Sequence, residues 1–273
     1  MSKTHFPIGA LDSGIGGLTV VKEIFAQLPA ENMLYFADLK RMPYGTKSSE
    51  EIKRYVTEIA EFLLTKNIKI LIIACNTATA AALKHLKKIL PIPVIGVIIP
   101  GVRAALKATK NKKIGVIGST GTIKSGAHEK ALKQINTELE VINQACPGLA
   151  EMIERGQIHT DKTEITIRKY LRPLKQQGID TLLLGCTHFQ FISNSIKKIM
   201  GEDITLVNPV QKTVKAVEIA LSNSNLMVDS YKSPGEQLHK IFVSEYSENF
   251  NFTVNQLFQQ EIEIKVLENY PRI

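Results

Sequence analysis

The sequence is poor in cysteine. Its 273 residues contain three, Cys75, Cys146 and Cys186, and these lie far apart in the chain. An odd and scattered set does not form a disulfide framework, and the spacing excludes a CxxC redox motif or a zinc site. Each cysteine is therefore predicted to be a free thiol.

Long apolar runs are also missing. No stretch approaches the roughly 18 continuous apolar residues of a membrane span, and residues 1–7 lead into a strand-like segment instead of an apolar signal-peptide core. We therefore expect a cytoplasmic protein without membrane contact. A content of 44% hydrophobic and 22% charged residues is typical of a globular chain with a sizeable core.

The formal net charge is +8, but the basic residues are not distributed as in a nucleic-acid-binding protein. Lysines are spread through amphipathic segments such as residues 84–90, and neither an arginine-rich run nor a stripe of aromatic residues suited to bases is present. The excess positive charge is interpreted as a solvated basic surface. No nucleic-acid partner is expected.

Two glycine-rich segments lack residues that nucleotide binding requires. Residues 12–19 (DSGIGGLT) have Thr19 where the GxGxxG fingerprint needs its third glycine. Residues 118–125 (GSTGTIKS) have Ile123 where a P-loop needs the glycine before its lysine. Nucleotide binding is therefore disfavoured.

The first glycine-rich segment begins with a carboxylate and a hydroxyl, Asp12 and Ser13, directly after a predicted strand. Backbone amides at the start of the following helix make this a suitable place to hold a small zwitterion. Either residue could instead merely cap that helix, so the position alone does not decide between the two roles.

Short runs rich in Ile, Val and Leu alternate with longer segments of helical periodicity. This alternation is typical of βαβ units, so the fold class is α/β with parallel sheets. The predicted strands are Ile8–Leu11, Met33–Ala37, Ile70–Ala74, Val94–Ile98, Lys113–Ile117, Glu140–Gln144, Thr181–Leu184 and Thr205–Val207.

Two strand-and-turn units recur along the chain. Residues 8–14 resemble residues 114–120 at an offset of 106 positions, and residues 70–77 resemble residues 181–188 at an offset of 111. The near-equal offsets indicate two similar parallel-sheet α/β domains. Loops after strand carboxyl ends form the ligand crevice in such sheets, so the two domains are expected to face each other across a cleft.

The domain boundaries are placed at the proline- and glycine-containing segments between these units. We expect a first domain over residues 1–98 and a second over residues 99–207. The last segment, residues 208–273, is expected to return to the first domain.

Cys75 and Cys186 occupy equivalent positions in the repeated units, each at the end of an apolar strand. A single cysteine in such a place is usually small buried packing, but a pair at matched positions near helix N-termini, which favour thiolate, is hard to attribute to packing. Two opposed thiols suit proton removal from one face of a carbon and delivery to the other. The pair therefore predicts racemisation or epimerisation.

Four motifs carry a resemblance to a known family. In order and spacing, the chain resembles the glutamate racemases of the aspartate/glutamate racemase superfamily over nearly its whole length. The matching segments are Asp12-Ser13-Gly14, Pro43-Tyr44-Gly45, Ala74-Cys75-Asn76-Thr77-Ala78 and Gly185-Cys186-Thr187-His188.

The resemblance implies interconversion of L- and D-glutamate without cofactor or metal, supplying D-glutamate for peptidoglycan, in a homodimer. It implies that Cys75 and Cys186 donate and accept the protons, with Asp12, His188 and Glu154 assisting. Substrate contacts are implied for Asp12, Ser13, Pro43, Tyr44, Gly45, Asn76, Thr77, Thr187 and His188, and a role for Cys146 and Pro147.

Read without the resemblance, several of these residues have simpler roles. Residues 43–45 form a turn in which Tyr44 could anchor the loop, and Cys146 has no counterpart in the other half and is best interpreted as structural. Glu154 lies in a charged helical stretch, residues 151–155, where a surface position would be ordinary.

The chain departs from the family pattern in two places, residues 189–192 (FQFI) and Asn208-Pro209. Both fall near the expected domain crossing and concern the hinge and dimer contacts. Among the alternatives, an aspartate racemase would carry Glu where His188 stands, so His188 favours glutamate. A pyridoxal-phosphate enzyme lacks its Schiff-base lysine context here, and a two-lobed ligand-binding module does not explain the paired thiols.

Overall fold

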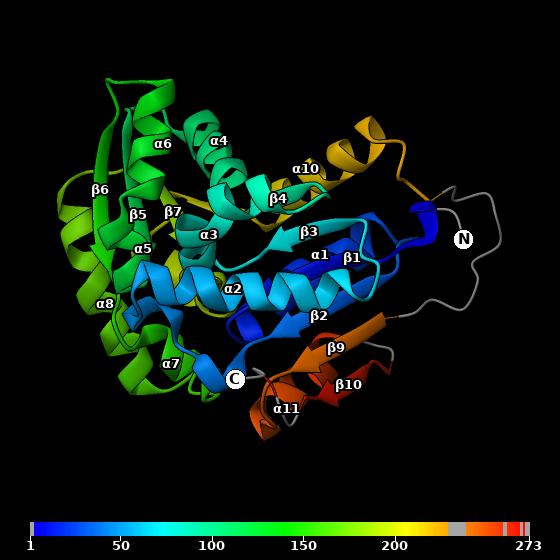
Figure 1. The fold of residues 1–273 in the computed structure, drawn as a ribbon. Coiled ribbons are helices and arrows are strands. Elements are labelled where there is room, and N and C mark those ends of the chain that lie inside the picture. Colours follow the sequence, from blue (N-terminus) through cyan, green and yellow to red (C-terminus); the bar gives the residue numbers. More distant parts are fainter. Residues whose placement is uncertain (1–2, 229–238, 259–260, 268–269, 271–273) are drawn as a thin grey trace.

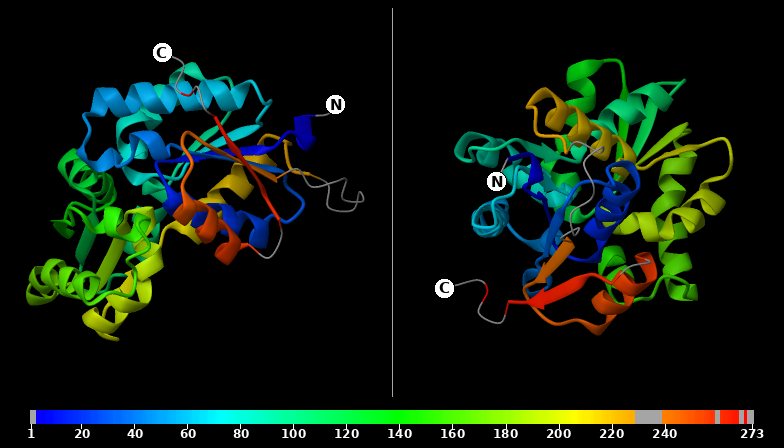
Figure 2. Two further views of the ribbon diagram at one scale, coloured as in Figure 1. Left: turned by 90° about the horizontal axis from the view of Figure 1, so that it is seen from below. Right: turned by 90° about the vertical axis from the view of Figure 1, so that its right-hand side faces the viewer.

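The computed structural model describes residues 3–228, 239–258, 261–267 and 270, which form two parallel β-sheets with helices on both faces of each (Figures 1 and 2). The α/β class with two facing domains, expected from the sequence, is confirmed. Among the described helices, none combines the length and apolar character needed to cross a bilayer.

Sheet A contains six described strands in the order β10-β9-β2-β1-β3-β4, all parallel. Its strands are β1 (Ile8–Asp12), β2 (Met33–Ala37), β3 (Ile70–Ile73), β4 (Val94–Gly96), β9 (His239–Val243) and β10 (Glu263–Val266). The helices packed on it are α1 (Leu18–Gln27), α2 (Ser49–Leu64), α3 (Asn76–Ile89), α10 (Val210–Asn223) and α11 (Glu248–Leu257).

Sheet B contains four described strands in the order β6-β5-β7-β8, again parallel. Its strands are β5 (Lys113–Gly118), β6 (Glu140–Ala145), β7 (Thr181–Gly185) and β8 (Thr205–Val207). Its helices are α4 (Ile98–Ala108), α5 (Thr120–Ser125), α6 (Ala127–Ile135), α7 (Leu149–Glu154), α8 (Asp161–Gln176) and α9 (Ser193–Met200). Five 3-10 turns complete the described part: Lys3–His5, Ile15–Gly17, Leu39–Arg41, Tyr44–Thr46 and Thr187–Ile192.

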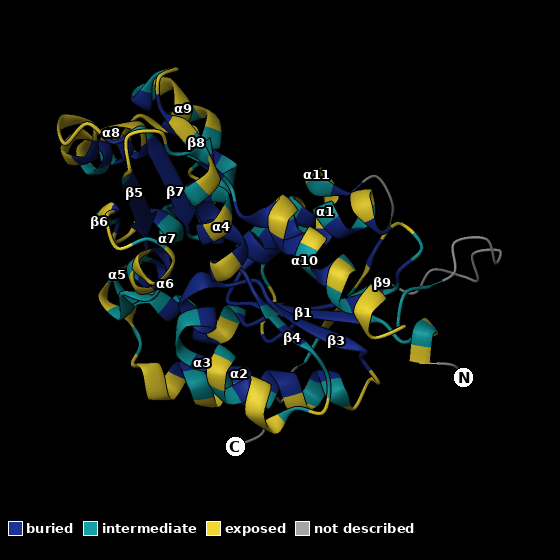
Figure 3. Ribbon diagram, turned by 90° about the horizontal axis from the view of Figure 1, so that it is seen from above, coloured by how far each residue is buried: buried dark blue, intermediate teal, exposed yellow. Residues whose placement is uncertain are grey.

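The central strands are buried on both faces because helices cover both, as expected for a parallel sheet. In sheet A, Ala10 and Ile72 face the core shared with α1 and α10, whereas Leu11 and Leu71 face the core shared with α2 and α3. Figure 3 shows the resulting pattern of buried strands between helices with exposed outer sides. This double cover produces the continuous apolar runs seen in the sequence.

The repeated units occupy matching places in the two sheets. β1 pairs with β2 and β3, and β5 pairs with β6 and β7 in the same arrangement. Cys75 therefore follows the strand beside β1, and Cys186 follows the strand beside β5. The repeat in the sequence corresponds to a repeat in the fold.

All eight predicted strands are present, with small shifts at their ends. The largest shift is in β4, which stops at Gly96 because α4 already begins at Ile98. β9 and β10 were not predicted. They are short strands at the edge of sheet A, where β9 pairs with β2 and β10 pairs with β9.

The chain passes from sheet A to sheet B between β4 and β5 and returns after β8, where α10 packs on α1. The boundaries at 98/99 and 207/208 remain proposals. Of the two departures from the family pattern, Phe189 is fully buried, and Asn208 accepts the backbone N–H of Val210 at 3.1 Å through Oδ1, at the start of α10.

Candidate active site

A pocket with an empty volume of about 580 Å³ lies where loops from both sheets meet. It is lined by residues that follow β1, β3, β5, β6 and β7, so the strand carboxyl ends of the two sheets converge on it. Ten of the twelve predicted site residues line it: Ser13, Pro43, Tyr44, Gly45, Cys75, Asn76, Thr77, Cys186, Thr187 and His188. Asp12 and Glu154 are buried behind this lining.

Cys75 is held at the start of α3, directly beyond β3. Its Sγ accepts the backbone N–H of Ala78 at 3.5 Å, as the N-cap of the helix. Burial, reinforced by the nearby charge of Asp12, raises the pKa of the Cys75 thiol to about 12. The helix amides favour thiolate, as the sequence indicated, but burial outweighs them, so Cys75 rests as a thiol.

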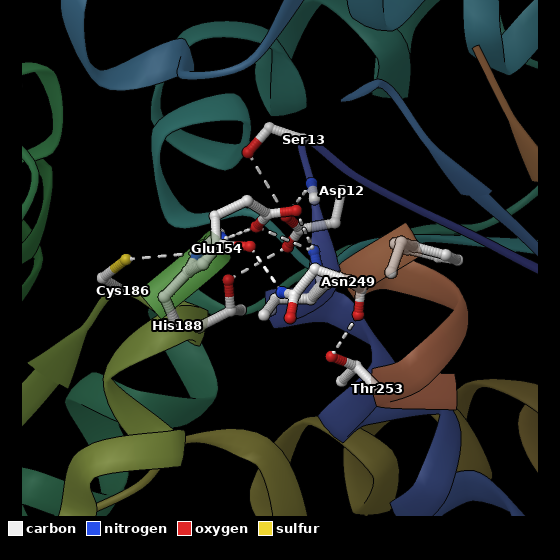
Figure 4. Close-up of polar contacts among 12 residues, drawn as sticks. Asp12, Ser13, Glu154, Cys186, His188, Asn249 and Thr253 are labelled. Atoms are coloured by element: carbon white, nitrogen blue, oxygen red, sulfur yellow. Dashed lines mark hydrogen bonds and ion pairs between the residues drawn. The ribbon is translucent and has the colours of Figure 1, made fainter. Parts of the chain in front are cut away.

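Cys186 is the half-buried thiol that the second domain contributes to the pocket, and it forms a chain of contacts with a histidine and a carboxylate (Figure 4). Its Sγ is 3.8 Å from Nδ1 of His188, whose Nε2 is 2.6 Å from Oε2 of Glu154. Burial lowers the pKa of His188, but hydrogen bonds to Cys186 and Glu154 and their charges outweigh it and raise that pKa well above its usual value. His188 is therefore an imidazolium at neutral pH.

Glu154 joins the two domains. It ends α7 of the second domain, and the backbone N–H of Ile15 in the first domain donates to its two carboxylate oxygens at 3.3 and 3.1 Å. A Cβ atom at Gly14 would lie 2.4 Å from Oε2 of Glu154, so only glycine fits there. The interpretation of Glu154 as a surface residue is wrong, because the residue is 9% exposed.

Asp12 makes a second contact between the domains. One carboxylate oxygen accepts the N–H of Gly14 at 3.1 Å, and the other accepts the hydroxyl of Thr187 at 3.1 Å. Burial raises the pKa of Asp12 to about 6, although the positive charge of His188 opposes the shift. Asp12 therefore does not cap the following helix, whose N-cap is Gly17 with no side-chain hydrogen bond; it accepts the N–H of Gly14 in its own turn and binds the opposite domain.

The glycines after Asp12 allow the loop of the second domain that carries Thr187 and His188 to approach the first domain closely. A Cβ atom at Gly16 would lie 2.3 Å from Oγ1 of Thr187 and 2.8 Å from Nδ1 of His188. The segment that fails the dinucleotide fingerprint thus lets the polar loop of the second domain reach the first. The sequence pattern shows these glycines but does not indicate the close approach that they permit.

Asn76 and Thr77 are oriented by residues of the second domain. Oγ1 of Thr77 is 2.9 Å from Oγ of Ser119 and 2.8 Å from Oγ1 of Thr122. Oδ1 of Asn76 is 3.1 Å from Nε2 of His128, whose pKa burial lowers to about 4, so this ring is neutral and can donate to Oδ1. Within the described chain, the buried Nδ2 of Asn76 has no hydrogen-bond partner.

Ser119, Thr122 and His128 were not among the predicted site residues. The likeness of residues 114–120 to residues 8–14 was the one sequence signal for Ser119, because it places Ser119 after β5 much as Ser13 follows β1. Nothing in the sequence distinguishes Thr122 or His128 from ordinary helix residues.

Tyr44 lies at the edge of the pocket in a loop of the first domain. Its buried hydroxyl donates to Oδ2 of Asp38 at 2.5 Å, and Arg41 donates to the same oxygen at 2.6 Å and to Glu58 at 2.5 Å. The hydroxyl thus anchors the loop, as its bare sequence context indicated. The adjoining Gly45 packs against Ser119 of the second domain.

The arrangement brings one thiol from each domain, Cys75 and Cys186, into the lining of one small pocket, each with its own ionisable neighbours. Such a site can remove a proton through one thiol and deliver one through the other. In the part of the chain that the structure describes, no group of three or more His, Cys, Asp or Glu side chains has the geometry to hold a metal ion.

The model of the Asp/Glu/hydantoin racemase family matches residues 8–217. The chain is 43% identical over 254 residues to the glutamate racemase of Oceanobacillus iheyensis, covering 93% of this chain and 92% of that one. Among solved structures, it is similar to glutamate racemase isoform RacE1 from Bacillus anthracis, with a TM-score of 0.91, 41% identity, and coverage of 97% and 98% of the two chains. It is also similar to the Francisella tularensis glutamate racemase in complex with D-glutamate, with a TM-score of 0.87, 34% identity and the same coverage.

Proposed function

Because the chain belongs to the Asp/Glu/hydantoin racemase family, we propose that it interconverts L- and D-glutamate by a two-thiol mechanism. The observation that carries the proposal is the presence of Cys75 and Cys186, which follow the matching strands β3 and β7 of the two domains, in the lining of a single pocket. Cys146 also lines this pocket, but it has no counterpart in the first domain, burial raises the pKa of its thiol, and its Sγ donates to the Gln144 carbonyl at 3.7 Å, so it is proposed as structural. The substrate follows from the relatives, which are named glutamate racemases, one of them holding D-glutamate.

The pocket offers donors for the carboxylates of such a substrate. Hydroxyls of Ser13, Thr77 and Thr187 and the unpartnered Nδ2 of Asn76 are the candidates. Hydrogen bonds to the α-carboxylate stabilise the negative charge that develops there as the α-proton leaves, so they make this proton more acidic. These residues are proposed as the binding set.

From L-glutamate to D-glutamate, the thiolate of Cys186 takes the α-proton, and the thiol of Cys75 then gives its own proton to the opposite face of the carbanion. The reverse reaction, from D- to L-glutamate, uses each group in the opposite role. Only protons are transferred, so no oxidant, reductant or further reactant is required. The imidazolium of His188 lies 3.8 Å from the Cys186 sulfur, a positive charge that suits a thiolate base there.

Cys75 rests protonated, because its pKa is about 12, so it holds the proton that the carbanion receives. To act as base toward D-glutamate it must lose that proton, and the α-ammonium group of bound substrate is proposed to favour this step by its charge. Asp12, whose charge acts on the Cys75 thiol, is proposed to assist Cys75.

A cytoplasmic homodimer that supplies D-glutamate for peptidoglycan is the proposed setting. The activity is tested by following the loss of the circular dichroism signal of L- or D-glutamate, with a chelator present and no added cofactor. Racemisation of glutamate supports the proposal, and turnover of aspartate instead would assign the chain to an aspartate racemase. Activity that depended on added pyridoxal phosphate or metal would overturn the two-thiol mechanism.

A further inference from the structure

Helix α11 belongs to the C-terminal part of sheet A, yet it reaches the second domain. It connects β9 and β10, which extend sheet A, and buries Phe250 and Val254 against the core on the α1 side of that sheet (Figures 1 and 2). Ser247 caps it by accepting the N–H of Phe250 at 3.2 Å. The first turn of α11 is therefore firmly attached to the first domain.

Asn249, in that first turn, contacts the backbone of Glu154. Its Nδ2 donates to the Glu154 carbonyl oxygen at 2.5 Å, and Thr253 donates to the Asn249 carbonyl at 2.8 Å (Figure 4). Carbonyls at a helix C-terminus have no partner within the helix, and Glu154 is the last residue of α7. Asn249 supplies the missing donor from the other domain.

The fit of the Asn249 amide is close. The chain turns away from α7 at Gly156, which has a φ of +73°, and a Cβ atom there would lie 2.8 Å from Oδ1 of Asn249. Glycine is thus required both by the backbone conformation and by the amide packed against it.

The first domain consequently binds Glu154 through both its side chain and its backbone. The N–H of Ile15 holds the carboxylate, and Asn249 holds the carbonyl. Between these two contacts, the carboxylate meets His188, which in turn meets Cys186. Cys75 is positioned separately, as the cap of α3 in the first domain.

We propose that Asn249 is a positioning residue for the Cys186 side of the reaction, acting through Glu154 and His188. This inference rests on the proposed function. It predicts that loss of Asn249 slows proton transfer by Cys186 and leaves proton transfer by Cys75 nearly unchanged, because Cys75 is held by α3 and not by Asn249.

The test measures α-hydrogen exchange in heavy water, at initial rates, with and without Asn249→Ala in two backgrounds: Cys75→Ala, where Cys186 exchanges L-glutamate, and Cys186→Ala, where Cys75 exchanges D-glutamate. Separate backgrounds are needed because both enantiomers cross the same two barriers in the intact protein, so a defect at either thiol slows both. In the proposed mechanism, Cys186 takes the α-proton of L-glutamate and Cys75 takes that of D-glutamate. The loss of one hydrogen bond from the support predicts that L-glutamate exchange falls about three- to tenfold, with less than about a twofold change for D-glutamate. Asn255→Ala removes the same side chain from an exposed position of α11 and should change neither rate.

An equal fall of both rates, or no fall, would overturn the positioning role while leaving the racemase proposal intact. Absence of exchange with either enantiomer in the parent protein would overturn the proposed function instead. Should Asn249→Ala fail to unfold cooperatively, Asn249→Asp replaces it, because aspartate keeps the shape and removes the donor. An unchanged ratio of the two rates in that variant would likewise reject the inference.

Discussion

Nε2 of His188 lies 2.6 Å from Oε2 of Glu154, and the two side chains are only 4% and 8% exposed. The pair is formed by residues 34 positions apart, and the chain offers no local motif that links them. A histidine whose pKa is raised in the folded protein keeps its proton, and the stabilisation that accompanies it, at neutral pH. It loses both as the pH rises through the folded pKa.

Replacing Glu154 by Gln should therefore lower the pKa of His188. The variant keeps the burial that lowers this pKa and loses the carboxylate that raises it, so only Cys186 still supports the charged ring, and the imidazole loses its proton at a lower pH than in the parent. We expect L-glutamate exchange at pH 8 to fall at least about tenfold, with a smaller deficit toward pH 6. Rates measured from pH 6 to 10 check this, with the exposed Glu202→Gln as the control for loss of a negative charge. A deficit independent of pH would contradict the electrostatic role.

Single replacement of either pocket cysteine should abolish racemisation but spare one half-reaction. The expected loss is about 10²–10⁴-fold, typical for an acid/base group. Residual exchange in heavy water should be confined to L-glutamate in Cys75→Ala and to D-glutamate in Cys186→Ala, as chiral analysis after long incubation would show. A single mutant that still racemised within about tenfold of the parent would return that cysteine to a packing role.

Gly14→Ala should separate activity from stability. The new Cβ would lie 2.4 Å from the Glu154 carboxylate, which must move away from Ile15 and His188. We expect a racemase loss of about tenfold or more, with a destabilisation of about 1–3 kcal/mol. Gly178→Ala is the matched control: its φ of +69° strains alanine by about 1 kcal/mol, but nothing lies within 4 Å of the new Cβ, so activity should persist. Equal activity in the two variants would argue against the close-approach role.

Asp12→Asn should stabilise the protein at neutral pH while removing activity. The folded pKa of Asp12 is about 6 against 3.8 in the unfolded chain, so native Asp12 binds its proton more tightly and stability falls as the pH rises from about 4 to 6. Asparagine avoids that loss, which is on the order of 2–3 kcal/mol. Urea unfolding should show a variant more stable than the parent at pH 7.5 and no more stable at pH 4. A variant less stable at pH 7.5 would show that the contact to Thr187 dominates.

The strands and the paired thiols were accessible from the sequence because each rests on a local pattern. A strand covered on both faces is an apolar run, and residues that follow it, such as Cys75 and Cys186, reach the carboxyl edge of the sheet. The repetition of this pattern at a nearly constant offset predicted two similar domains, and the motifs predicted the family. β9 (HKIFV) and β10 (EIKV) were not predicted because lysine and other polar residues interrupt them, so neither is the continuous apolar run by which the core strands were recognised.

By itself, then, the sequence determined the α/β class, the eight core strands, the family and the residues that follow those strands. Tertiary structure alone decided the burial of Glu154, its contacts with His188, Ile15 and Asn249, the groups around Asn76 and Thr77, and the purpose of Gly14 and Gly16. The reason is physical. Helices and strands follow from periodicities of two to four residues, whereas these contacts join distant positions, as for Ile15 and Glu154, which are 139 apart. Such contacts arise only when two separately patterned sheets pack face to face.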